Sequence, residues 1–98
     1  MMTELLPFLK EMISAPGLTG HEAPIRAMIK KAWQPLTDEL QISRLGSLHG
    51  LRRGRAREGG PVPSILYTAH MDAIGLMVTG VVDGLLRVAR VGGVDARV

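Results

Sequence analysis

Residues 64–80 read SILYTAHMDAIGLMVTG, an almost wholly apolar stretch that contains two polar side chains, His70 and Asp72. The run SILYTA, residues 64–69, predicts a strand covered on both faces, because doubly covered strands are continuously apolar. Since residues i and i+2 of a strand point to the same face, we expect His70 and Asp72 to project together from its carboxyl end. In open α/β sheets, ligands bind at this edge.

Two amphipathic helices are expected before this strand. The first has apolar residues at helical spacing and should end by Ala15, because a Pro-Gly pair follows. Thr19 or Gly20 is expected to cap the second helix, whose helical spacing continues to Leu36. The N-terminal part of the sequence is therefore predicted to be helical.

Short strands are expected after these helices, two of them before residues 64–69 and two after: residues 40–42, 47–53, 74–82 and 85–91. A turn at Gly46 separates the first two. The pair Asp83-Gly84 favours a tight hairpin turn between the last two. Helices followed by strands predict the α/β class, with no helical pattern after Asp72.

Composition limits the classes of protein that this sequence fits. The 98 residues leave room for one domain, and aromatic residues make up only 3%. There is no cysteine, which fits a reducing compartment. The N-terminus lacks the basic start and unbroken apolar core of a signal peptide, and no apolar run approaches the ~20 residues of a membrane span. We therefore expect a cytoplasmic protein that does not associate with membranes.

The net charge of +3 has a local origin in four arginines: Arg52, Arg53, Arg55 and Arg57. Such a cluster can bind phosphate or nucleic acid. The surrounding glycines, and the lack of interleaved aromatic residues for base stacking, favour a solvated hairpin tip instead. We expect no nucleic-acid partner, with weak binding through this cluster as a minor alternative.

His70 and Asp72 have a spacing that suits metal binding. A carboxylate beside a histidine can accept the hydrogen of one ring nitrogen and leave the other nitrogen for a metal. The His-x-Asp spacing also arises often by chance, and a metal needs three or more ligands. The residues alone therefore leave two interpretations, a metal ligand with its carboxylate or a strand-end histidine beside a turn. His21 and His49 are expected to be surface histidines, and Asp83 and Asp95 to be turn residues.

The sequence HMDAIGLMV, within residues 69–98, resembles the segment around the first metal ligand of the tetrahedral, or deblocking, glutamyl aminopeptidases. These are dinuclear metallopeptidases, some of whose members have been labelled endoglucanases. The sequence LLPFLKEMISAPGLTGHEAPIRAMI resembles the opening helices of that family, and RLGSLHGLRRG resembles the strand pair that follows. The resemblance covers essentially the whole chain.

The resemblance implies that His70 binds one of two divalent metal ions, zinc or cobalt, and that Asp72 is the catalytic-site carboxylate that orients His70. It implies an α/β zinc-peptidase domain whose N-terminal part is residues 1–73. Residues 74–98 would begin an inserted small β domain that takes part in homo-oligomer formation. The implied function is hydrolysis of N-terminal residues from peptides. The other ligands and the general-base glutamate lie further along the chain in the family, so we expect a fragment that is inactive alone.

Three positions depart from the family pattern, which usually has Glu, Asn and Asp where this sequence has Ala73, Ser47 and Ser43. A function of another class also remains open. The strands within residues 74–98 could pair edge to edge with a partner chain, which would make this sequence a non-catalytic oligomerisation fragment.

Overall fold

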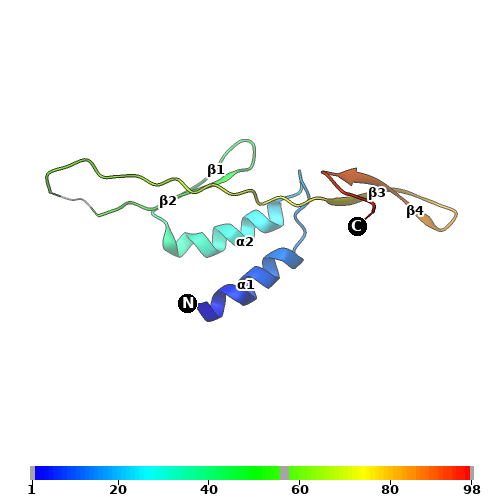
Figure 1. Ribbon diagram of the computed structural model, residues 1–98, viewed down its shortest axis with the longest axis horizontal. Helices are drawn as coiled ribbons and strands as arrows, with labels where there is room; N and C mark the ends of the chain where they lie inside the picture. The colour runs from blue at the N-terminus through cyan, green and yellow to red at the C-terminus, as the bar shows by residue number, and fades with distance from the viewer. Residues whose placement is uncertain (1, 56–57, 98) are drawn as a thin grey trace. The chain divides into compact units, whose positions relative to one another are not determined.

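A computed structural model of the protein describes residues 2–55 and 58–97 (Figure 1). Its helices and strands, in chain order, are α1 (Met2–Ser14), α2 (Ala23–Trp33), a short 3-10 helix (Gln34–Leu36), β1 (Glu39–Ile42), β2 (Leu48–Leu51), β3 (Gly75–Val82) and β4 (Leu85–Val91). In the described residues, β1 pairs with β2 and β3 with β4, both antiparallel. These helices and small sheets agree with the expected α/β class.

The chain divides into two compact units. One joins Met1–Ile25 with Met71–Val98, and the other is Arg26–His70. No helix in the described residues has both the length and the apolar character that crossing a lipid bilayer requires.

Helix α1 confirms the prediction of a helix that ends by Ala15. At its end, the hydroxyl of Ser14 donates a hydrogen bond to the carbonyl oxygen of Lys10 at 2.8 Å. The expected apolar stripe is present, and Met12 is half-buried, but its other members are 50–75% exposed: Leu5, Leu6, Leu9 and Ile13. The amphipathic pattern therefore specifies a helix whose apolar face stays open within its own unit.

Helix α2 begins at Ala23, so the prediction that Thr19 or Gly20 caps it was wrong by a few residues. The intervening residues form a turn of their own, in which the backbone N–H of His21 donates to the carbonyl of Leu18 at 2.7 Å. Gly20 adopts a φ of 86° in this turn, a left-handed conformation that suits glycine. The turn therefore delays the start of the helix.

The first sheet, β1–β2, confirms the expected pair of short strands with a turn at Gly46. Its register pairs Glu39 with Leu51 and Ile42 with Leu48. Ser43 and Ser47 close the loop between the strands. The backbone N–H of Ser43 donates to the carbonyl of Ser47 at 2.9 Å, and the N–H of Ser47 donates to the hydroxyl of Ser43 at 3.1 Å. The two serines that depart from the family pattern therefore bond to each other.

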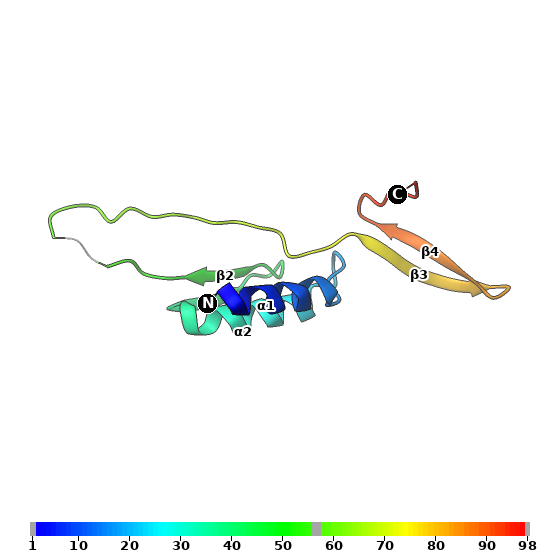
Figure 2. The ribbon, with the colours of Figure 1, turned by 60° about the horizontal axis from the view of Figure 1, so that its bottom comes forward.

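The second sheet is the hairpin β3–β4, which confirms the Asp-Gly prediction (Figure 2). Asp83 has a φ of 50° and Gly84 a φ of 76°. Two consecutive left-handed residues are what a type I′ turn requires, and its twist matches that of the flanking strands. The register shifts between Val78 and Gly80, which leaves Thr79 as the extra residue of a bulge.

The strand predicted at residues 64–69 is absent, and this prediction was wrong. Ile65, Leu66 and Tyr67 are 77%, 86% and 87% exposed, and no strand in the described residues pairs with them. An apolar run indicates a segment suited to burial, whereas a strand also needs a neighbour to take its backbone hydrogen bonds. The expected position of His70 and Asp72 at the end of a strand was wrong for the same reason.

A short parallel bridge joins Leu18 to Ala73 within the first unit. The N–H of Ala73 donates to the carbonyl of Gly17 at 2.7 Å, and the N–H of Thr19 donates to the carbonyl of Ala73 at 3.2 Å. Gly17 is buried against Ile25, which is itself only 5% exposed. We call the residues of these contacts, 17–19 with 73, the loop junction.

Replacing Gly17 with alanine is expected to loosen the loop junction. The new methyl carbon would lie 2.8 Å from Cγ1 of the buried Ile25, and overpacking of this kind costs about 1–3 kcal/mol. Hydrogen exchange of the Ala73 amide should therefore accelerate by roughly tenfold or more. Gly93→Ala is the matched control, because no atom lies within 4 Å of its added carbon. Equal protection in the two variants would contradict the prediction.

Replacing Gly84 with alanine is expected to reduce the population of the β3–β4 hairpin. A left-handed conformation costs a residue with a Cβ atom about 1–2 kcal/mol, and Gly84 has a φ of 76°. The cross-strand nuclear Overhauser effect between the paired residues Val78 and Val88 measures this population. Gly80→Ala serves as the control, because its added carbon has open space and the glycine has no positive φ. A hairpin equally populated in both variants would refute the expectation.

Candidate functional site

Asp72 is held by a residue far away in the sequence. Its Oδ2 atom accepts a hydrogen bond from the hydroxyl of Thr19 at 2.8 Å, across 53 positions of sequence. Asp72 is half-buried, whereas Thr19 is exposed in the loop between α1 and α2. The sequence prediction gave Thr19 a capping role, so this contact of Asp72 was missed.

The backbone next to Asp72 is fixed by the loop junction. Ala73 follows Asp72 directly and exchanges backbone hydrogen bonds with Gly17 and Thr19. These bonds use only the main chain of Ala73. They therefore do not depend on the glutamate that usually stands at this position in the family that the sequence resembles. The backbone that carries the Asp72 carboxylate is therefore anchored beside the Thr19 loop.

His70 is exposed and belongs to no helix or strand. It follows residues 64–69, which form no strand, and stands three residues before the bridge at Ala73. Across residues 2–55 and 58–97, no group of three or more His, Cys, Asp or Glu side chains could hold a metal ion. His21 and His49 are also exposed, in the loop before α2 and in β2. The assignment of His70 and Asp72 to a metal site stays a prediction.

Two other candidate carboxylates have local structural roles. Glu22 accepts a hydrogen bond from the N–H of Gly20 at 2.7 Å and so closes the turn before α2. Asp83 occupies the type I′ turn between β3 and β4. Asp83 was expected in a turn, and this position is confirmed.

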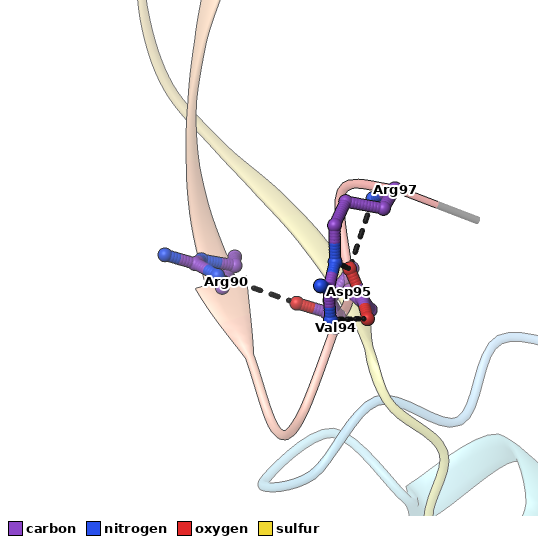
Figure 3. A network of polar contacts seen from close by, with 4 residues as sticks. All are labelled: Arg90, Val94, Asp95 and Arg97. Carbon is purple, nitrogen blue, oxygen red and sulfur yellow. Dashed lines mark hydrogen bonds and ion pairs between the residues drawn. The ribbon is translucent and has the colours of Figure 1, made fainter.

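Asp95 accepts hydrogen bonds from Arg97 in the turn after β4, as Figure 3 shows. The Nε and Nη2 atoms of Arg97 lie 3.0 and 2.9 Å from the two carboxylate oxygens, and the backbone N–H of Arg97 also donates to Asp95. These bonds, the side-chain pair first, lower the pKa of the Asp95 carboxyl and raise that of Arg97. Asp95 is therefore a turn residue, as expected.

The arginine cluster makes contacts within its own unit. Arg53 forms an ion pair with Glu39, and its backbone N–H donates to Asp38 at 2.6 Å. Arg52 donates to the carbonyl of Leu36 at 3.5 Å. Arg57 lies outside the described residues. The absence of a nucleic-acid partner stays a prediction.

Comparison with known proteins identifies relatives along most of the chain. The model of the M42 glutamyl aminopeptidase family matches residues 46–98, which include His70 and Asp72. The lysyl aminopeptidase of Pyrococcus furiosus is 38% identical over 88 residues, 88% of this chain and 24% of the relative. A relative from Acetivibrio thermocellus is 35% identical over 94% of this chain and 26% of its own length. The glutamyl aminopeptidase of Lactococcus lactis subsp. cremoris is 29% identical over 92% of this chain and 25% of its own length. The chain spans about a quarter of the length of these relatives.

The 98-residue chain is expected to bind zinc weakly. Structural and catalytic zinc sites use three or four protein ligands, whereas the motif supplies one imidazole and one neighbouring carboxylate. Isothermal calorimetry should therefore give no tight stoichiometric complex, and hydrolysis of peptides by this chain alone should be absent. Tight one-to-one binding of zinc would overturn this expectation.

Proposed function

The chain belongs to the M42 glutamyl aminopeptidase family, and from this membership we propose that it forms the N-terminal part of a metal-dependent aminopeptidase. The complete enzyme would remove N-terminal residues from peptides. The observation that carries the proposal is the family match over residues 46–98, which spans the His-Met-Asp motif. Relatives from Pyrococcus furiosus and Lactococcus lactis are aminopeptidases by name. Because the chain spans about a quarter of their length, the activity belongs to the complete protein.

His70 would be a ligand of one of two divalent ions, zinc or cobalt, and Asp72 would orient its ring. An imidazole nitrogen suits either metal. When bound, such a pair of ions polarises the peptide carbonyl and lowers the pKa of a bound water. A carboxylate such as that of Asp72 can accept the hydrogen of one histidine ring nitrogen and so orient the ring. Its Oδ2 atom also accepts a hydrogen bond from Thr19. The remaining ligands and the general-base glutamate would come from parts of the protein that correspond to the rest of the relatives.

The proposed domain arrangement divides the chain near Ala73. Residues 1–73 would belong to the catalytic domain, and residues 74–98 would begin the inserted small β domain. The β3–β4 hairpin supports this arrangement, since it carries apolar side chains that are 52–75% exposed: Leu76, Val78, Val81, Leu85 and Leu86. In a complete cytoplasmic enzyme these side chains would pack within the inserted domain and between subunits of a homo-oligomer.

The same exposed hairpin would also suit a non-catalytic oligomerisation fragment. Both interpretations predict apolar side chains on β3 and β4, so the hairpin alone does not separate them. The aminopeptidase names of the relatives favour the catalytic proposal.

A chimaeric enzyme tests the proposal. In it, this chain replaces the matched quarter of the Pyrococcus furiosus lysyl aminopeptidase, to which it is 38% identical. The chimaera is expected to release N-terminal residues from peptides when zinc or cobalt is supplied. His70→Ala should lower kcat/KM by about 100-fold or more, and Asp72→Asn by about 10- to 100-fold.

His49→Ala is the matched control, because His49 is an exposed histidine of β2 and has no expected role at the metal. It should retain the activity of the unmodified chimaera. The proposal fails if the folded chimaera, assembled to the same size as its parent, hydrolyses no peptide. It also fails if His70→Ala retains as much activity as His49→Ala.

A further inference from the structure

The hydrogen bond between Thr19 and Asp72 joins the inter-helix loop to the motif that carries His70. We propose that Thr19 is a positioning residue of the metal site, whose hydroxyl holds the Asp72 carboxylate in the orientation that aims the imidazole of His70. This inference rests on the proposed function, since it takes His70 as a metal ligand.

The contact itself has the geometry of a strong hydrogen bond. Thr19 Oγ1 lies 2.8 Å from Asp72 Oδ2, a usual separation for a hydroxyl donor and an oxygen acceptor. A bond to an ionised acceptor is stronger than one between neutral groups. It also restricts the rotation of the Asp72 side chain, because the acceptor is the outermost atom of that side chain.

The backbone on both sides of the contact is fixed independently of it. Thr19 donates its N–H to the carbonyl of Ala73 at 3.2 Å, and Ala73 donates its own N–H to Gly17 at 2.7 Å. Residue 19 is therefore bonded to the neighbour of Asp72 through the main chain. These main-chain bonds place the hydroxyl beside the carboxylate and do not depend on the side-chain bond.

The loop that carries Thr19 is also closed on itself. The N–H of His21 donates to the carbonyl of Leu18 at 2.7 Å, and the N–H of Gly20 donates to a carboxylate oxygen of Glu22 at 2.7 Å. These two bonds do not involve the Thr19 hydroxyl. Removal of that hydroxyl should therefore leave the loop and the junction in place and remove one restraint on the carboxylate.

The pair of substitutions Thr19→Val and Thr19→Ser separates the hydroxyl from the shape of the side chain. Valine keeps the branched shape of threonine without the donor, whereas serine keeps the donor without the methyl group. A positioning role predicts that serine preserves the wild-type behaviour and valine does not. A packing role predicts the reverse.

Titration of the 98-residue chain with zinc chloride, followed by the NMR signals of the three histidine rings, measures the effect. The rings of His21 and His49 report the affinity of an ordinary exposed imidazole. Thr19→Val is expected to weaken zinc binding at His70 by about 3- to 10-fold. This is at or below the low end of the loss of metal affinity that follows removal of a residue that orients a metal ligand. Thr19→Ser should match the wild type, and the rings of His21 and His49 should not change in either variant.

A double-mutant cycle shows whether the effect passes through Asp72. In an Asp72→Asn background, Thr19→Val should produce little further loss of zinc affinity at His70, because the carboxylate that Thr19 positions is gone.

The inference is overturned if Thr19→Val binds zinc at His70 as the wild type does. Equal losses at all three rings, or a loss in Thr19→Ser as large as in Thr19→Val, would also overturn it. So would faster hydrogen exchange of the Ala73 amide in Thr19→Val, because the loop junction itself would then depend on the hydroxyl.

The outcomes for the inference and for the proposed function are distinct. The proposed function is judged in the chimaera, by hydrolysis of peptides and its dependence on His70. The inference is judged by zinc affinity at His70 in the chain itself. A chimaera that requires His70 but a Thr19→Val chain that binds zinc normally would retain the aminopeptidase proposal and reject the role of Thr19.

Discussion

Two backbone hydrogen bonds at the loop junction set the geometry of the first unit. They join Gly17 and Thr19, which follow α1, to Ala73, which precedes β3. The close approach depends on small residues, because a side chain at Gly17 would collide with the buried Ile25. The same two bonds anchor the backbone beside Asp72, so the local fold and the candidate site share one constraint.

Hydrogen bonds and glycines, more than burial, organise the described parts of this chain. Ile25 and Leu48 are its buried apolar side chains in the described residues, at 5% and 9% exposure. The apolar stripe of α1, the hairpin side chains and residues 65–67 stay exposed. Contiguous exposed apolar surface marks sites of contact with other protein segments. The turns need only a few neighbouring residues, whereas the loop junction joins residues 17–19 to residue 73.

Local signals in the sequence predicted the local structure well. The helical spacing before Ala15 gave α1, and Asp83 with Gly84 gave the type I′ turn, because each depends on residues close together in the chain. The strand expected at residues 64–69 failed, because its existence depends on a pairing partner that periodicity does not supply. The later start of α2, at Ala23, was missed because Thr19 and Gly20 were both taken as candidate caps, whereas they lie in a separate turn.

The candidate site shows the same division between local and distant information. The spacing and neighbours of His70 and Asp72 identify the motif, and the family match includes both. Thr19, which donates a hydrogen bond to Asp72, lies 53 positions away, and no spacing rule connects the two residues. A histidine and a carboxylate in a short motif supply the chemical groups of such a site. The carboxylate can orient the histidine ring only if its own side chain is held in one conformation. The precision of such a site depends on how its second residue is held, and here the donor and the backbone bonds come from the loop after α1. The loop after α1 and Asp72 therefore share their contacts within the first unit, and substitutions at Gly17 or Thr19 are expected to affect the same carboxylate as substitutions beside Asp72.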